Sequence, residues 1–296
     1  MDWYPEEPDV VQLDRAEGES PLRYEDVSQD GRLMLLALPH TIGDVIWRKI
    51  LADHPLGKLV HTGVVGILTR FIIEGGQGPV GVGKPLRAEG RFQLAHTVDA
   101  RGEVDRLVLN MWTSAWAPRG RTHGPPPPGA DEPIPVGRVF AEHVMTRPFA
   151  PPSERKVLTM PGAGEPPPTR YEWRDPSAVL SLPPGARPLD AELLPDPVEV
   201  VFGLTHTDFN QHVNSLVYPR LFQEAALRRF ADHGLSTKVL AQRLEIAYRK
   251  PCFAGERARM VLRAFADGDR LGAVGAFVSE RAPLERPHCV IQMKFA

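Results

Sequence analysis

Two segments from opposite halves of the chain repeat one pattern. The first is AEGRFQLAHTVDARGEVDRLVLNMW (Ala88–Trp112), and the second is AGERARMVLRAFADGDRLGAVGAF (Ala254–Phe277), with a two-residue difference at the turn. Each has Ala, Gly and Arg before a strand-like stretch, then a turn of Gly with Asp or Glu, then Asp-Arg-Leu. A pattern that recurs in this way favours two domains of one kind in tandem.

The composition is that of an ordinary globular protein. The chain has 296 residues, 42% of them hydrophobic and 24% charged, which suits one large domain or two of ordinary size. Its formal net charge of −2 argues against a nucleic-acid-binding protein. Cys252 and Cys289 are too few for a disulfide framework, which fits a reducing compartment. No apolar run is long enough to span a bilayer, and the acidic first residues do not have the pattern of a signal peptide. We therefore expect a cytoplasmic protein.

The start of the chain predicts a polar arm and one helix. We expect residues 1–20 to be ordered only where Trp3, Tyr4 or Leu13 contacts a surface. In His40–Leu51 the apolar residues recur with helical spacing.

The following segments predict one further helix and two strands. Leu59–Ile73 is rich in β-branched residues, but its length favours a buried helix. Gly83–Leu94 and Val98–Trp116 show a period close to two and predict extended strands.

The middle of the chain is unusually rich in proline. Pro125–Pro128 and Pro166–Pro168 are tracts that neither a helix nor a central strand accommodates. Between them, Val136–Val144 predicts either a strand or a short helix. We therefore interpret residues 118–190 as a connector that runs over the surface from one domain to the next.

The C-terminal half predicts one strand, one long helix and four further strands. The helix is Pro219–His233, with proline in its first turn. The expected strands are Val198–Leu204, Leu244–Arg249, Arg257–Ala266, Leu271–Glu280 and Cys289–Phe295.

Three polar residues precede the long helix. Asp208, Asn210 and His212 occupy alternate positions, and the segment that follows has helical spacing. Backbone N–H groups at the start of a helix lack partners and the local potential is positive. We expect the three side chains to converge there, where an oxyanion could bind and a water could be activated.

This motif resembles the signature of the acyl-ACP thioesterases, which have the hotdog fold. The likeness consists of D-x-N-Q-H-V-N with a Tyr and a Glu later, although Ser215 stands where the family has a second Asn. Arg23–Asp44 loosely resembles the N-terminal half of that family. The residues that match are Asp208, Asn210, Gln211, His212, Val213, Asn214, Tyr218 and Glu224.

The resemblance implies an α+β chain of two tandem hotdog domains. In each, a curled antiparallel sheet wraps around a long central helix. We expect an arm at 1–20, a non-catalytic domain at 21–117, the connector at 118–190 and the catalytic domain at 191–296. Asp30 and Asp44 lie at places roughly equivalent to the motif, without an accompanying Asn and His.

Within this resemblance Asp208 is either a general base or a nucleophile, and the sequence does not decide between them. Asn210 would orient the water or the carboxylate, and His212 would polarise the thioester carbonyl or relay a proton. The alternatives are an N-capping Asp, an Asx-turn Asn and a hydrogen-bonded structural His. Backbone N–H groups of Val213–Ser215 are candidates for an oxyanion hole.

Other assignments are weaker. Glu224 could equally be a solvated helix residue. Cys252 matches a family cysteine, but Pro251 stands where the family has Glu, and a small buried hydrophobe explains Cys252 equally well. The expected substrate-binding residues are Val213, Asn214, Ser215, Tyr218 and Arg249. The cations that could bind a pantetheine phosphate or an acidic carrier, or form a solvated face, are Arg220, Arg228, Arg229, Arg249 and Lys250.

The expected function is hydrolysis of a fatty or polyketide-like acyl thioester carried by acyl carrier protein or coenzyme A. An enoyl-thioester hydratase or dehydratase and a non-hydrolytic acyl-thioester binder are the alternatives. The sequence has no zinc-ligand spacing and no glycine-rich phosphate loop, so we expect no metal or organic cofactor. A tandem hotdog could be a monomer or a homodimer.

Overall fold

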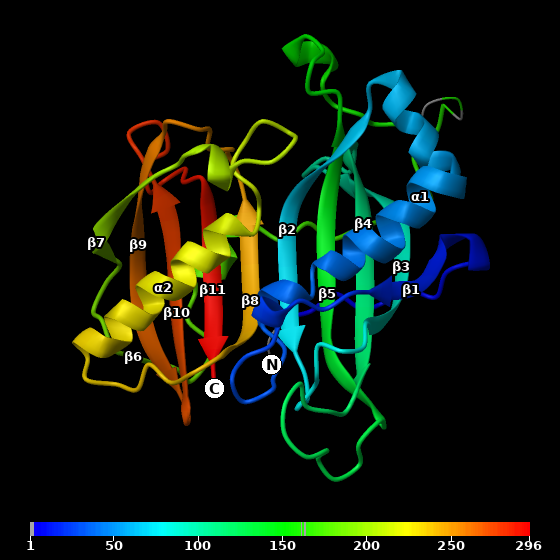
Figure 1. The fold of residues 1–296 in the computed structure, drawn as a ribbon. Helices are drawn as coiled ribbons and strands as arrows, with labels where there is room; N and C mark the ends of the chain where they lie inside the picture. The colour runs from blue at the N-terminus through cyan, green and yellow to red at the C-terminus, as the bar shows by residue number, and fades with distance from the viewer. Residues whose placement is uncertain (1–2, 161, 163) are drawn as a thin grey trace. The chain divides into compact units, whose positions relative to one another are not determined.

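The computed structural model describes residues 3–160, 162 and 164–296, and it divides into two compact units (Figure 1). The N-terminal unit is Trp3–Arg174, and the C-terminal unit runs from Asp175 to Ala296. The expected arm and connector therefore include positions 1, 2, 161 and 163, which lie outside the described residues. Among the described residues, no helix combines the length and the apolar character needed to cross a bilayer.

The N-terminal unit is built on an antiparallel sheet with the strand order β1-β3-β4-β5-β2. Its longest pairings join β3 to β4 and β4 to β5, as the alternating sequence of the two expected strands predicts. The strands are β1 (Arg15–Ser20), β2 (Val65–Gly75), β3 (Leu86–Val98), β4 (Val104–Pro118) and β5 (Pro133–Thr146).

The helix predicted at residues 40–51 is confirmed. A π-helical segment, Ile42–Trp47, continues into α1 (Arg48–Asp53) and buries Ile46 and Ile50. Gly90 on β3 allows the close approach, since a Cβ there would lie 2.7 Å from Cγ1 of Ile46. The 3₁₀ segments of this unit are Gln12–Asp14, Tyr24–Asp26, Leu35–Ala37, Pro55–Thr62 and Pro152–Glu154.

The helix predicted at 59–73 is wrong. The 3₁₀ segment ends at Gly63, whose φ of 75° is left-handed, and β2 begins at Val65. β2 pairs along its length with β5, and this tertiary pairing suits the β-branched residues of the segment.

The proline-rich region contains a full strand of the N-terminal sheet. β5 pairs with β4 on one side and with β2 on the other, so the first unit extends to Arg174 instead of ending at residue 117. Pro133 and Pro135 lie at the start of β5, beside a register shift, which is where a strand tolerates proline.

The C-terminal unit has the antiparallel strand order β8-β11-β10-β9-β6, and β7 also pairs with β9. The five strands and the helix expected in this half are all present. They are β7 (Leu194–Val201), α2 (Val217–Asp232), β8 (Ala241–Tyr248), β9 (Arg257–Asp267), β10 (Arg270–Val278) and β11 (Cys289–Phe295). The unit also has the short strand β6 (Arg187–Pro188), which was not expected, and 3₁₀ segments at Pro176–Leu180 and Leu204–His206.

α2 packs its apolar side on this sheet (Figure 1). Phe222, Ala225, Ala226 and Phe230 are buried, and the Phe230 ring meets Phe295 of β11 edge-on at 5.2 Å. The spacing of these residues is the helical period read from the sequence.

The opposite face of each sheet is covered by chain segments that contain neither α-helix nor strand. In the N-terminal unit, Trp3, Tyr4 and Tyr171 pack on Ile72, Trp112 and Phe140. In the C-terminal unit, Val179 and Leu180 pack on Ala247, Ala276 and Val290. The N-terminal arm is thus ordered by the aromatic contacts expected of it, and it ends in strand β1.

Candidate functional site

The motif corresponds to one tight loop, Thr207–Val213. A bridge between Thr207 and Val213 closes the loop, and the Asp208 N–H donates to the His212 carbonyl at 3.1 Å. Gln211 turns the chain with a φ of 63°, a left-handed conformation that is uncommon outside glycine. The turn brings Asp208, Asn210 and His212 onto the same short loop.

The Asp208 carboxylate is fixed by two donors. One oxygen accepts the backbone N–H of Asn210 at 2.9 Å, and the other accepts the side-chain amide of Asn214 at 3.1 Å. Because both carboxylate oxygens are hydrogen-bonded, this arrangement fixes the orientation of the carboxylate. The carboxylate is only partly buried, so a reacting molecule can reach it.

The other two motif side chains are less constrained. Asn210 is exposed, and His212 is half-buried with Nδ1 3.2 Å from the Val213 carbonyl. Among the described residues, no hydrogen bond joins the side chains of Asp208, Asn210 and His212 to one another. The expected convergence therefore amounts to a shared loop and no direct side-chain contact. Phe209, at the loop's tip, is 99% exposed.

The motif does not itself open the helix. α2 begins at Val217 with Leu216 as its N-cap, so Asp208 is not the capping residue. Asn214 forms the connecting turn, because its side-chain oxygen accepts the Leu216 N–H at 2.9 Å. The Asx-turn considered for Asn210 is thus found at Asn214 instead.

Two of the three expected oxyanion donors are already engaged. The Val213 N–H donates to the Cys252 carbonyl at 2.8 Å, and the Asn214 N–H donates to the His206 carbonyl at 2.9 Å. Within the described residues, the Ser215 N–H has no hydrogen-bond partner. Ser215 is therefore the remaining backbone donor for a developing oxyanion.

Tyr218 and Cys252 form a buried support beneath the loop. The Tyr218 hydroxyl oxygen accepts the Cys252 N–H at 3.1 Å, and Tyr248 donates its hydroxyl to the Ser215 carbonyl at 2.8 Å. Burial raises the pKa of the Cys252 thiol to about 11 and also raises the pKa of Tyr218. A thiol with this pKa is protonated at neutral pH, which argues against Cys252 as a nucleophile.

Among the described residues, Glu224 and most of the candidate cations have no side-chain hydrogen bond or ion pair to this loop. Glu224 is exposed on α2 with no recorded partner in the described chain. Arg228 pairs with Asp196 at 3.1 Å, and Lys250 donates to the Arg281 carbonyl at 2.9 Å. Arg229 lies 3.8 Å from Asp190.

Arg220 and Arg249 are the two expected cations that remain available. Both are exposed, and neither has an ion pair among the described residues. They are the members of the expected set that could meet a phosphate group or an acidic carrier.

The residue that reasoning from the sequence missed is His206. Its Nδ1 accepts the Gly203 N–H at 2.9 Å, and its ring meets Phe202 edge-on at 5.8 Å. His206 ends the 3₁₀ turn that leads into the motif loop. The signal available in the sequence was its place two residues before Asp208.

A second loop, Val27–Leu33 in the N-terminal unit, has the same backbone hydrogen bonds. It too is closed by an antiparallel bridge between its ends, and Ser28 N–H donates to the Arg32 carbonyl at 2.8 Å. Gly31, with a φ of 83°, occupies the position of the left-handed Gln211.

The lead-in to the two loops also agrees. Asp26 ends a 3₁₀ turn and accepts the Arg23 N–H at 2.8 Å, just as His206 accepts from Gly203. The Met34 N–H donates to the Asp26 carbonyl at 2.7 Å, as the Asn214 N–H does to His206.

The side chains of the second loop differ from the motif. In place of Asp208, Asn210 and His212, this loop has Ser28, Asp30 and Arg32, and Arg32 is paired with Asp30 at 2.7 Å. Asp30 thus corresponds to Asn210. Asp44, the other acid considered, lies on the π-helical segment and accepts the Ser20 hydroxyl.

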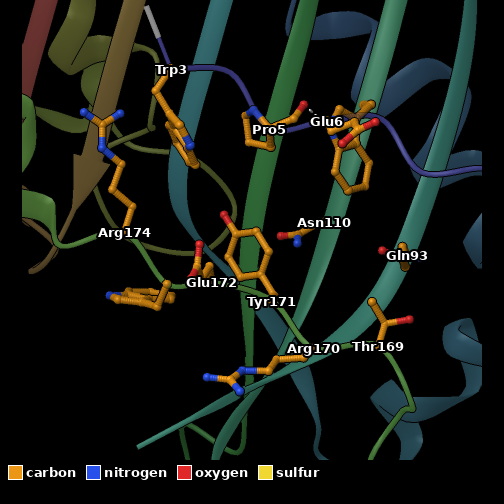
Figure 2. Close-up of a pocket in the computed structure, with 12 residues that line it drawn as sticks. Trp3, Pro5, Glu6, Gln93, Asn110, Thr169, Arg170, Tyr171, Glu172 and Arg174 are labelled. Atoms are coloured by element: carbon orange, nitrogen blue, oxygen red, sulfur yellow. Dashed lines mark hydrogen bonds between the residues drawn. The ribbon is translucent and has the colours of Figure 1, made fainter. Parts of the chain in front are cut away.

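Two cavities lie in the N-terminal unit. One, of about 500 Å³, is lined by the second loop together with residues that include Pro79 and His123. The other, of about 700 Å³, lies on the sheet face opposite the helix (Figure 2). In the described part of the chain, no group of His, Cys, Asp and Glu side chains is placed to hold a metal ion.

The chain is similar in structure to proteins of known fold. Over 96% of this chain and 99% of the other, it resembles an acyl-ACP thioesterase from Bacteroides thetaiotaomicron, with a TM-score of 0.55 and 12% identity. Over 96% of this chain and 94% of the other, it resembles the 12:0-ACP thioesterase from Umbellularia californica, with a TM-score of 0.56 and 12% identity. No protein-family model and no curated protein sequence matches this chain.

Proposed function

Since the chain has the fold of the acyl-ACP thioesterases along nearly its whole length, we propose that it hydrolyses acyl thioesters. The observation that carries the proposal is the Thr207–Val213 loop, which holds an oriented and accessible Asp208 carboxylate. A fold alone does not specify a reaction, so the proposal depends on this loop.

In the proposed reaction Asp208 acts on the acyl carbon or on a water beside it. As a general base it takes a proton from water, whose oxygen then adds to the thioester carbon, and the thiol leaves with a proton. As a nucleophile it forms an acyl anhydride that water hydrolyses. Either route yields a free acid and a free thiol.

The neighbouring groups have supporting roles in this proposal. Asn210 and His212, on the same loop, would orient the water and polarise the carbonyl. The free N–H of Ser215 would donate to the developing oxyanion, a contribution of roughly 3 kcal/mol to lowering the barrier. Arg249, which is exposed, is proposed to contact the carrier.

We propose further that the two units are tandem hotdog domains and that only the C-terminal one is catalytic. The shared hydrogen bonds of the two loops support a duplication. Ser28 stands where Asp208 does, so the second loop lacks the base, and its acid Asp30 is neutralised by Arg32.

A panel of acyl-CoA and acyl-ACP substrates of graded chain length tests the proposal. Release of free thiol, followed with a chromogenic disulfide, indicates hydrolysis. A change in enoyl absorbance without thiol release would indicate a hydratase and would contradict the proposal. The panel also separates acyl carrier protein from coenzyme A as the carrier, and fatty from polyketide-like acyl groups.

A non-hydrolytic acyl-thioester binder is the second candidate. It is favoured by the lack of hydrogen bonds between the three motif side chains and by Pro251 at the position expected to hold an acid. Saturable binding of acyl-CoA without any thiol release would support it over hydrolysis.

A further inference from the structure

The larger cavity of the N-terminal unit has polar chemistry that thioester hydrolysis does not use. It lies between the arm residues Trp3–Glu6 and the segment Thr169–Arg174, which we call the strap (Figure 2). The strap is tied to β3, since the His96 N–H donates to the Thr169 carbonyl and the Tyr171 N–H donates to the His96 carbonyl. We call this cavity the strap pocket.

The floor of the strap pocket belongs to a row of four polar side chains that crosses the sheet. The strand registers place Gln93 opposite Asn110, Asn110 opposite Glu142, and Glu142 opposite Arg70. Directly paired residues point to the same face of a sheet, so the row lies together. The row lies on the face of the sheet that points away from the helix. Gly90 and Thr113, three positions from Gln93 and Asn110 along β3 and β4, face the helix. Successive side chains of a strand alternate between the two faces, so Gln93 and Asn110 face the other way.

Asn110 carries an unsatisfied acceptor into this pocket. The residue is 1% exposed and lines the cavity, and its side-chain oxygen has no hydrogen-bond donor among the described residues. Figure 2 shows the amide of Asn110 beside the Tyr171 ring. Buried carbonyl oxygens are nearly always paired, so this one calls for a donor from an occupant of the pocket.

Glu142 lies beside Asn110 in the row, and Arg70 lies opposite Glu142 in the strand register. Glu142 is 1% exposed, and its two oxygens accept the Thr69 hydroxyl at 2.8 Å and the Tyr171 hydroxyl at 2.9 Å. These bonds hold the strap over the row. Burial raises the pKa of the Glu142 carboxyl, and the charge of the buried Arg70 acts in the opposite direction.

The walls and rim also suit a cation. Trp3, Trp112 and Tyr171 line the pocket, and the Trp3 ring already receives two guanidinium groups, from Arg174 at 4.7 Å and from Arg70 at 5.5 Å. Glu6 and Glu172 stand at the rim, both exposed and with no ion pair among the described residues.

Three of the donors around the pocket are committed elsewhere or point away from Asn110. The Trp112 indole N–H donates to the Pro5 carbonyl at 3.3 Å, and the Tyr171 hydroxyl is used by Glu142. Figure 2 shows the Arg170 guanidinium extending away from Asn110. Among the described residues, these three groups therefore give no hydrogen bond to the Asn110 side-chain oxygen.

We propose that the strap pocket binds a small organic amine in its ammonium form. One N–H would donate to the Asn110 side-chain oxygen, and the positive charge would lie against the aromatic rings and near Glu172 and Glu6. The site lies wholly within the N-terminal unit and does not depend on the thioesterase assignment.

Calorimetric titration of the full-length chain tests the proposal. The probes are butylamine, 1,4-diaminobutane and benzylamine, with butanol, benzyl alcohol and adenosine monophosphate as comparisons. We expect saturable binding of at least one amine, and at least about tenfold weaker binding of the alcohol of the same skeleton, since the alcohol lacks the charge. No amine binding, equal affinity for amine and alcohol, or binding of the nucleotide in place of the amines would overturn the proposal.

Variants locate the site. Asn110→Ala should weaken amine binding about tenfold by removing the acceptor, and Glu172→Gln should weaken it about threefold by removing a rim charge. Glu172 is exposed, so its variant reports on binding even where the Asn110 variant folds poorly. Glu103→Gln, an exposed acid on the β3–β4 turn of the same sheet, is the matched control and should bind as the native chain does. A Glu172→Gln variant that binds no less tightly than Glu103→Gln contradicts the assignment.

Discussion

The side-chain amide of Asn214 donates to the Asp208 carboxylate at 3.1 Å, across the loop that separates the two residues. Asn214 also accepts the Leu216 N–H with its own side-chain oxygen, at 2.9 Å. One side chain therefore links the carboxylate of the motif to the turn that begins α2. Through this link the helix fixes the direction in which Asp208 points.

Replacing Asn214 should disturb the reaction without removing the acid. We expect Asn214→Ala to lower kcat roughly 10- to 100-fold while KM changes little, because Asp208 loses a donor and its orientation. Asn214→Asp should lower kcat at least as far, since a second carboxylate cannot donate to Asp208 and repels it. A native kcat for both variants would mean that Asn214 does not hold Asp208 for the reaction.

Cys252 should be dispensable for turnover. The thiol is buried and its pKa is raised to about 11, so it is not a thiolate at neutral pH. We expect Cys252→Ala to keep kcat within about threefold and to lower the free energy of unfolding by about 1 kcal/mol through lost packing. Iodoacetamide at neutral pH should leave the native protein active. Rapid inactivation by this reagent, with protection by substrate, would point to a catalytic thiol.

The buried Glu142 should make stability depend on pH. Burial raises its pKa in the folded state, and a carboxyl of this kind stabilises the fold most below its ordinary pKa. That contribution is lost as the pH rises through the folded-state pKa. We therefore expect the difference in unfolding free energy, native minus Glu142→Gln, to fall as the pH is raised from about 4 toward neutrality. Urea titrations at a series of pH values measure it, and a difference that rises with pH contradicts the prediction.

Gly90 should be required for the helix to approach the N-terminal sheet. A Cβ at this position would lie 2.7 Å from Cγ1 of Ile46, whose side chain is buried. We expect Gly90→Ala to destabilise the protein by about 1–3 kcal/mol, as overpacking does. Gly83→Ala is the matched control, because a Cβ there has nothing within 4 Å. Equal unfolding midpoints for the two variants would show that the close packing is not as described.

Much of the fold could be predicted from local patterns. Period-two alternation indicated β3 and β4, and the spacing of Phe222, Ala226 and Phe230 located α2, because each pattern reports which side of an element is buried. Residues 59–73 could not be assigned in this way. Their conformation depends on pairing with β5, and the proline tracts around β5 left its sequence open between a strand and a short helix.

The candidate site could be found from the sequence only in part. The spacing of Asp208, Asn210 and His212 marked the loop, but the roles of His206 and Asn214 depend on backbone hydrogen bonds that no spacing encodes. The row from Gln93 to Arg70 is also absent from any local pattern, since it arises only when four strands take one register. A site of this kind is formed by residues that are far apart in the sequence, so no local pattern predicts it.

The central claim is that Asp208 performs the chemistry, and the rate of thiol release by Asp208→Asn tests it most directly. Asp30→Asn, an acid of the equivalent loop in the N-terminal unit, serves as its matched control. With the best substrate of the panel and a native circular dichroism spectrum, we expect Asp208→Asn to lose about 10³-fold or more in kcat, while Asp30→Asn stays within about twofold of the native chain. A folded Asp208→Asn protein that releases thiol at a near-native rate would contradict the account.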